Sequence, residues 1–285
     1  MIASLAKLAL KLLLTLLLGG LLATTLVRFA PGFGMDEAQL DIRLSNQSID
    51  ALNHQPKENI AGFYYRYCQR LLHGDFGRSR TLERPVSELI RERLPETLKS
   101  VGLGLFLGWV LGLSLASIAV MARSASLDWL AGIFCGTLLC LPAAVLAIVF
   151  VIAQAPERLV LAAAVFPQIY HYARNLLMRS LNQPHVLTAW AKGMGSLRLL
   201  CWHVLRPAAP QLLAVAGVSV SLAFTAAIPV EALCDLPGVG QLAWKAAMGR
   251  DLYLLVTLTV LVTAVTLIAN STCELLGNML GARRA

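Results

Sequence analysis

Charged residues are scarce in this chain of 285 residues, at 14% of the total against about 25% in soluble domains. Hydrophobic residues make up 57% of the sequence, and the mean hydropathy is +0.68. The apolar residues also fall in long runs, a pattern that places the chain in a lipid bilayer. The net charge of +8 does not indicate nucleic acid as a partner, because lysines and arginines flank the apolar runs as they do in membrane proteins.

The sequence also lacks the patterns of common catalytic and metal sites. It contains no G-x-x-x-x-G-K-[ST] phosphate loop, so the chain is not expected to bind or hydrolyse ATP. Its six cysteines form no CxxC pair, and its histidines form no HxxxH pair. No Ser–His–Asp or paired-carboxylate set stands out. We therefore predict a protein that is not an enzyme and that holds no metal or cofactor of its own.

Six apolar runs are present, and each is a candidate membrane-spanning helix. They cover residues 12–27, 100–121, 127–153, 159–177, 210–230 and 252–276. The first is either a secretory signal or an uncleaved helix. The uncleaved helix is favoured because no small-residue cleavage site directly follows the run. Pro142 predicts a bend within the third run, and the fourth run is weaker because Pro167, His171 and Arg174 interrupt it.

The predicted fold class is all-α: a polytopic membrane protein with six transmembrane helices. Residues 1–99 hold the first helix and a larger extracytoplasmic segment, in which we expect amphipathic helices near 58–73 and 84–94. Residues 100–285 form a five-helix core with a polar loop at 182–206. Glycines at 102, 104, 108 and 112 of the second run allow close contact with another helix.

Basic residues in the short loops predict the orientation. Ten of them lie at the two termini, in the 122–128 turn and in the 174–206 segment, whereas the opposite short loops, 154–158 and 231–251, carry three. The positive-inside rule then places both termini and the 182–206 loop in the cytoplasm.

The 182–206 loop has the pattern of two short helices around a glycine bend. Asn182 is a candidate helix cap and Pro184 suits a first turn. Gly193 or Gly195 ends this helix, and Ser196 is a candidate cap for the next. Pro207 and Pro210 mark the return to the membrane.

Two interpretations of this loop stay open from the residues alone. It is an ordinary connector on the membrane surface, with Leu197, Leu200 and Val204 toward lipid. Alternatively it is a docking helix, in which Ala189, Ala191 and Gly193 let the backbone of a partner approach closely.

Several stretches resemble the permeases of ABC transporters, in particular the peptide/nickel importer branch. "TAWAKGMG" (188–195), followed by "HVLRPAAP" (203–210), is similar to the cytoplasmic loop of these permeases that docks on the ATPase subunit. The stretches "RFAPG" (28–32), "LLHGDFGRS" (71–79), "RPVSELIRERLPETLKSV" (84–101), "VEALCDLPGVGQL" (230–242) and "RDLYLL" (250–255) resemble further family segments in the same order.

The resemblance implies two sets of functional residues. The residues that couple to the ATPase are Leu187, Thr188, Ala189, Ala191, Lys192, Gly193, Met194, Gly195 and His203. The loop that reaches toward the outer gate contains Glu231, Asp235, Pro237, Gly238 and Gly240, with the glycines accepting backbone angles that other residues avoid. The residues themselves give a third set: Tyr170, His171 and Arg174 in the fourth run are candidate pathway residues, although snorkelling also accounts for the arginine. For Glu231 the alternative is a hydrated interfacial acid or a cap for the loop.

The implied assembly is an importer in a bacterial inner membrane. This chain contributes half of the pathway for dipeptides or oligopeptides. Its partners are a second, related permease chain in a heterodimer, two ATPase subunits that hold ATP and magnesium, an extracytoplasmic solute-binding protein and membrane lipid, with no nucleic acid.

Some positions depart from the family pattern. Leu187, Trp190, Cys234 and Leu236 differ from the residues usual there, and the "QAPER" turn (154–158) replaces a long extracytoplasmic loop, of which "VFP" (165–167) resembles a remnant. A transport-inactive relative acting as a structural or regulatory subunit, or a permease for nickel or another small solute, is therefore kept as an alternative.

Overall fold

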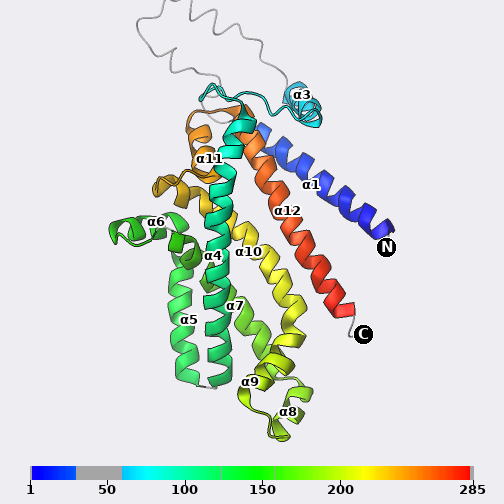
Figure 1. Cartoon of the computed structure of the whole chain (residues 1–285), viewed down its shortest axis with the longest axis vertical. Coiled ribbons are helices and arrows are strands. Elements are labelled where there is room, and N and C mark those ends of the chain that lie inside the picture. Colours follow the sequence, from blue (N-terminus) through cyan, green and yellow to red (C-terminus); the bar gives the residue numbers. More distant parts are fainter. Residues whose placement is uncertain (1, 30–59, 123, 157, 283–285) are drawn as a thin grey trace, which may run out of the picture. The chain divides into compact units, whose positions relative to one another are not determined.

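The computed structural model describes residues 2–29, 60–122, 124–156 and 158–282 (Figure 1). Within these ranges the regular elements are helices, apart from an isolated β-bridge between Arg78 and Pro85. The described chain divides into two compact units. One contains residues up to Arg91 together with Lys245–Thr263, and the other contains Glu92–Trp244 and the segment from Ala264 onward. The sequence-based division at residue 99 stays a prediction.

The first unit is built on helices α1 (Ile2–Phe29) and α3 (Ile60–Leu72). The Tyr64 hydroxyl donates to the Leu17 carbonyl at 2.7 Å, and the Tyr67 hydroxyl donates to the Thr257 hydroxyl at 3.1 Å. Burial raises the pKa of both tyrosines above the ordinary value, so the hydroxyls keep their protons and donate at neutral pH. A Cβ at Gly20 would lie 2.7 Å from the Tyr64 hydroxyl oxygen, so the glycine lets the tyrosine side chain approach α1 closely.

Asp251 organises the remainder of the first unit. Its carboxylate accepts hydrogen bonds from the Ser79 hydroxyl at 2.6 Å and from the Thr81 backbone N–H at 3.1 Å. It also accepts from the Leu254 N–H at 3.1 Å, in the first turn of α12 (Leu252–Ala282). A carboxylate at a helix N-terminus satisfies N–H groups that the helix itself leaves open. Asp251 therefore caps α12 and fixes the 79–82 turn with one side chain.

The second unit holds most of α4 and a set of helices packed beside it (Figure 1). Their bounds are α4 (Val86–Ala122), α5 (Ala125–Cys140), α6 (Ala143–Ile152), α7 (Arg158–Leu181), α8 (Pro184–Ala191), α9 (Ser196–Leu199), the π-helix η2 (Leu200–Leu205), α10 (Arg206–Leu233) and α11 (Val239–Met248). Their apolar core draws buried residues from many of these helices, including Ala116, Tyr170, Leu177, Val186 and Val204.

Close packing of α4 on α7 depends on the glycines of α4, as the sequence predicts. A Cβ at Gly104 would lie 2.6 Å from the Leu161 Cβ, and one at Gly112 would lie 2.9 Å from the Ile169 Cγ2. Such distances are below van der Waals contact, so these glycines let the two backbones approach. Gly102 is different, because nothing lies within 4 Å of a Cβ built there.

The predicted bend at Pro142 is confirmed, and it is sharp. Helices α5 and α6 meet at an angle of 98°. Pro142 has no N–H to continue the hydrogen bonding of α5, and it begins α6 as the residue before Ala143. The third apolar run is therefore a broken pair of helices.

Three helices of the described chain are long and apolar enough to cross a membrane. They are Val86–Ala122, Ser196–Leu233 and Leu252–Leu280, and the bent α5–α6 pair adds a fourth. Leu12–Leu26 is apolar but shorter. The count of six spans and the extracytoplasmic segment stay predictions, and residues 30–59 of that segment lie outside the described ranges.

Several predicted helix boundaries are wrong. No separate helix covers 84–94, because α4 begins at Val86 and continues through Pro95 into the second apolar run. Gln183, rather than Asn182, precedes α8, and it makes no side-chain cap. Gly195 precedes α9, so Ser196 is its first residue rather than its cap. Pro207 and Pro210 lie within one continuous helix that runs from Ser196 to Leu233, and their place at the return to the membrane stays a prediction.

The glycine contact predicts unequal effects of the same substitution at two positions of α4. Alanine in place of glycine favours a helix by up to about 1 kcal/mol, but overpacking costs about 1–3 kcal/mol. We expect Gly104→Ala to lower the melting temperature of the detergent-purified protein and Gly102→Ala to leave it equal or higher. Thermal unfolding of the two variants measures this, and equal melting temperatures would show that α4 and α7 do not pack this closely.

Candidate functional site

The hairpin formed by residues 184–205 lies where α7 and α10 converge, at one end of the second unit (Figure 1). Helix α8 begins with Pro184 and ends at the cap Lys192. Gly193 then adopts a φ of +77°, a left-handed conformation that favours glycine. The predicted arrangement of helix, glycine bend and helix is therefore confirmed, and the second helix continues through η2 into α10.

One face of the hairpin packs on the core of its own chain. Val186 and Ala189 are buried in the core of the second unit, and Met194 packs against it. Ala189 is therefore not available to a partner, contrary to the docking interpretation of that residue. Val204 is also fully buried, so it does not face lipid as the connector interpretation expects.

The opposite face of α8 is exposed and partly apolar. Leu187 is 59% exposed and Trp190 is 56% exposed. Thr188, Ala191, Lys192, Gly193 and Gly195 are exposed beside them. Leu187, Trp190 and Ala191 share a face because residues three and four apart are neighbours on a helix. An exposed apolar patch of this kind is typical of an interaction surface.

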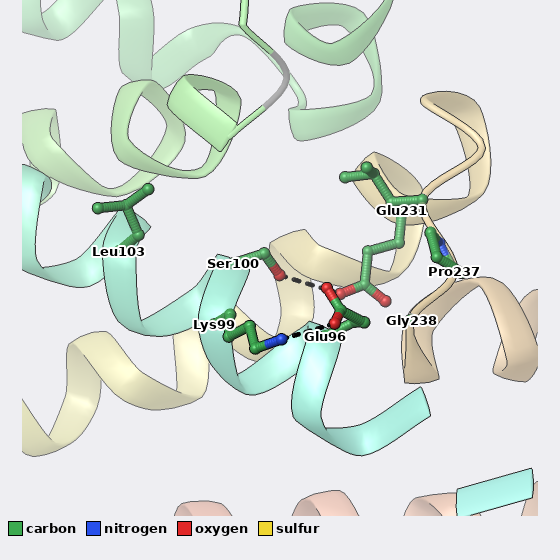
Figure 2. Close-up of a pocket in the computed structure, with 8 residues that line it drawn as sticks. Glu96, Lys99, Ser100, Leu103, Glu231, Pro237 and Gly238 are labelled. Atoms are coloured by element: carbon green, nitrogen blue, oxygen red, sulfur yellow. Dashed lines mark hydrogen bonds and ion pairs between the residues drawn. The ribbon is translucent and has the colours of Figure 1, made fainter. Parts of the chain in front are cut away.

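The predicted outer loop is organised by Glu231, near the end of α10. Its side chain is 1% exposed. Its Oε2 accepts from the Thr97 hydroxyl at 3.1 Å and from the Gly240 N–H at 2.7 Å. The Ser100 hydroxyl lies 3.3 Å from its Oε1. Figure 2 shows Ser100 of α4 and Glu231 of α10 pointing toward each other.

Glu231 and Thr97 together cap helix α11. The Val239 N–H donates to the Thr97 hydroxyl at 2.7 Å, and the Gly240 N–H donates to Glu231. These donors belong to the first turn of α11, which has no intrahelical partners for them, and a negative charge is favourable there. The carboxylate is thus buried and used as a cap, which agrees with the loop-cap alternative and not with a hydrated interfacial acid.

The glycines of this loop serve close approach rather than unusual backbone angles. A Cβ at Gly238 would overlap the Glu231 carboxylate, and one at Gly240 would lie 2.7 Å from the Ile228 Cα. The left-handed conformation falls instead on Asp235, with a φ of 52°. The Asp235 carboxylate accepts from the Gln241 side-chain amide at 2.5 Å. The predicted role of these glycines in shaping the turn through their backbone angles is therefore wrong.

A small pocket opens beside this cap (Figure 2). It is lined by Glu96, Lys99, Ser100, Leu103, Glu231, Leu236, Pro237 and Gly238. The Lys99 ammonium binds the Glu96 carboxylate at 2.8 Å. Because donors of the chain itself surround the Glu231 carboxylate, this arrangement joins α4, α10 and α11 mechanically rather than offering a free acid.

The candidate pathway residues lie close together on α7, in different surroundings. Tyr170 is 0% exposed and belongs to the apolar core, with its ring against that of His171 at a centroid distance of 5.1 Å. Tyr170 therefore reaches no open space in this structure. Arg174 forms a two-pronged ion pair with Asp128 of α5, through its Nε and one terminal nitrogen. Both side chains are partly buried.

Sequence reasoning missed the partners in these two arrangements. Asp128 is an acid at the start of an apolar run, a signal that points to function or pairing, but the sequence does not say with which residue. Thr97 and Ser100 lie one turn apart on α4, and their hydroxyls face Glu231 only because the fold brings α10 there.

The Glu231 cap predicts a loop that opens when the carboxylate is removed. Glu231→Ala leaves buried donors unpaired, at a cost of about 1–3 kcal/mol each. We expect faster tryptic cleavage at Lys245 or Arg250 in the detergent-purified variant, and an intermediate rate for Glu231→Gln. Glu96→Ala, at the rim of the same pocket, is the control with the wild-type rate. Equal cleavage of all four proteins would contradict the cap.

The Asp128–Arg174 pair predicts a measurable coupling between α5 and α7. Partly buried, two-pronged pairs exceed the value of about 0–1 kcal/mol that is usual for exposed pairs. In a double-mutant cycle of Asp128→Asn and Arg174→Gln, we expect the double variant to lose clearly less unfolding free energy than the two single losses combined. Arg179→Gln, exposed on the same helix, should combine additively with Asp128→Asn. Additive losses of unfolding free energy for Asp128→Asn and Arg174→Gln would show that these two side chains do not interact.

Comparison with known proteins gives the family. Residues 104–284 match the model of the family described as binding-protein-dependent transport system inner membrane component. The oligopeptide transport system permease protein OppB of Escherichia coli K12 is 26% identical over 238 residues, covering 76% of this chain and 78% of the relative. The OppB protein of Salmonella typhimurium LT2 is 28% identical over 262 residues, covering 84% and 85%.

The fold agrees with this result. A chain of the MetNI methionine ABC transporter in an inward-facing conformation superposes with a TM-score of 0.58 at 18% identity, covering 67% of this chain and 96% of that chain. A second crystal form gives a TM-score of 0.59 at 16% identity. The family match spans more than half of the sequence, and this chain belongs to the binding-protein-dependent transport system inner membrane components.

Proposed function

We propose that this chain is the permease subunit of an ATP-driven importer of oligopeptides, and that it couples to a separate ATPase through the 184–205 hairpin. The observation that carries the proposal is the exposed apolar face of α8, with Leu187 and Trp190 each more than half exposed. This face lies on a short helix that is fixed to the ends of α7 and α10 by its opposite, buried face.

The hairpin has the properties needed to transmit a conformational change. A partner shifts an equilibrium only through different affinities for the two states. An ATPase that binds the α8 face differently before and after ATP binding would supply this difference. Because the second helix of the hairpin is continuous with α10, displacement of the hairpin displaces a membrane-spanning helix.

The substrate class follows from the relatives. Proteins named as oligopeptide transport system permeases match 76–84% of this chain, and a protein named as a putative peptide permease of Brucella suis matches 90% at 26% identity. The proposed substrate is therefore a short peptide. The alternatives of an inactive scaffold and of a nickel permease have no such support.

The proposed assembly places this chain beside a second, related permease in a bacterial inner membrane, with both termini in the cytoplasm. Two ATPase subunits hold ATP and magnesium, and this chain binds no cofactor. An extracytoplasmic binding protein delivers the peptide near the Glu231 loop. The basic residues on the hairpin side, among them Lys192, Arg198 and Arg206, support this orientation.

Substitutions at Gly193 test the coupling role. Gly193→Arg places a long, charged side chain on a residue of the docking face that has a left-handed backbone. Gly193→Asn is the matched control, because asparagine tolerates this conformation. We expect both variants to insert in the membrane, and only Gly193→Arg to lose ATPase co-purification and peptide uptake. The measurements are a pull-down through a tag on the chain and uptake of a labelled peptide by cells. Full uptake by Gly193→Arg would refute the docking role.

A further inference from the structure

The start of α10 contains a π-helix beside a proline. The π-helix η2 covers Leu200–Leu205, and Pro207 follows it within the same continuous helix. In an α-helix the N–H of residue 207 would donate to the His203 carbonyl, but proline has no N–H. A π-turn also disturbs the regular ladder, and such turns are frequent at functional positions. The His203 carbonyl therefore lacks its α-helical donor and can accept a hydrogen bond from another element.

Two neighbouring helices supply such donors. The His185 ring, on α8, lies with its Nε2 at 3.1 Å from the His203 carbonyl oxygen. A carbonyl only accepts, so Nε2 is the protonated nitrogen in this contact. The buried Ser180 hydroxyl, on α7, donates to the carbonyl of Val204 at 2.9 Å. Consecutive carbonyls of η2 thus receive side chains from the two helices that flank it.

These contacts differ in kind from the apolar packing of α8. Val186 and Ala189 bury the underside of α8, and such packing is not directional. A hydrogen bond is directional, and it weakens steeply when the donor turns away from the acceptor. The His185 contact therefore adds a directional constraint on the position of α8 along η2.

We propose that η2 is the joint through which displacement of α8 passes to α10, with His185 and Ser180 as its positioning residues. This inference rests on the proposed coupling of the hairpin to an ATPase. It adds that the coupling depends on the His185–His203 contact.

The contact is tested first on the isolated chain. Ketone-bearing amino acids are encoded at the exposed positions 191 and 211 and carry the spin labels, so the native cysteines stay in place. Pulsed electron paramagnetic resonance then measures the distance between α8 and α10. We expect a narrow distribution for the parent, a broad one for His185→Phe, and a narrow one for His185→Gln, whose amide also donates.

The matched control is a substitution in α10 that removes a side-chain hydrogen bond within that helix. Thr225 of α10 donates to the Ser221 carbonyl of its own helix at 2.9 Å, so Thr225→Val should keep the distribution narrow. A narrow distance distribution for His185→Phe would contradict the proposed role of η2. A distribution for Thr225→Val as broad as that of His185→Phe would contradict it as well.

The second readout is the number of peptides transported per ATP hydrolysed by the assembled transporter in proteoliposomes. We expect His185→Phe to lower this ratio at least threefold and His185→Gln to restore it, with the ATPase co-purifying at the parent yield in both. An unchanged ratio would overturn transmission through η2. Failure of the proposed function looks different, because the parent chain itself would then recover no ATPase and transport no peptide.

Discussion

A polar group that is buried in a membrane protein must find its hydrogen-bond partner within the protein, because lipid offers none. The second unit is organised by this constraint. The Trp109 indole N–H donates to the Ser219 hydroxyl at 3.0 Å, and the Asn270 amide donates to the Ser221 hydroxyl at 3.1 Å. Each pair joins two different helices, and each therefore selects one arrangement among the many that apolar packing alone would accept.

Glycine and proline serve this constraint in opposite ways. At Gly217 a Cβ would lie 2.7 Å from the Asn270 side-chain oxygen, so glycine lets that amide reach its partner on α10. Proline instead removes a donor and leaves a carbonyl for another element, as Pro207 does for His203. In a chain with few charges, the positions of glycine and proline decide where polar groups of different helices can meet.

The sequence predicts the helical class, the bend at Pro142 and a left-handed glycine at position 193 or 195, since each depends on local chemistry. Runs of apolar residues and the backbone limits of proline and glycine act within a few residues. The glycine face of α4 was also predictable, because helical spacing places Gly104, Gly108 and Gly112 together.

The partners of the functional side chains were not predictable from the sequence. Arg174 stands out in an apolar run, but its pairing with Asp128 spans 46 positions. The bond from Thr97 to Glu231 spans 134 positions. The two predicted caps of the hairpin failed for a related reason: Asn182 and Ser196 have suitable side chains, but the helices begin at neighbouring positions where Pro184 and the Gly193 bend set the backbone.

Both ends of the continuous helix from Ser196 to Leu233 are held by directional contacts. At one end, the His203 and Val204 carbonyls receive side chains from α8 and α7. At the other end, Glu231 holds Thr97 of α4 and the first turn of α11. The two sets lie about 40 Å apart at the rise of a helix, a distance that crosses a bilayer. Hydrogen bonds are directional, so they fix the position of the helix at each end more strictly than apolar burial alone does. The continuous helix therefore connects the hairpin to the Glu231 loop through directional contacts at both of its ends.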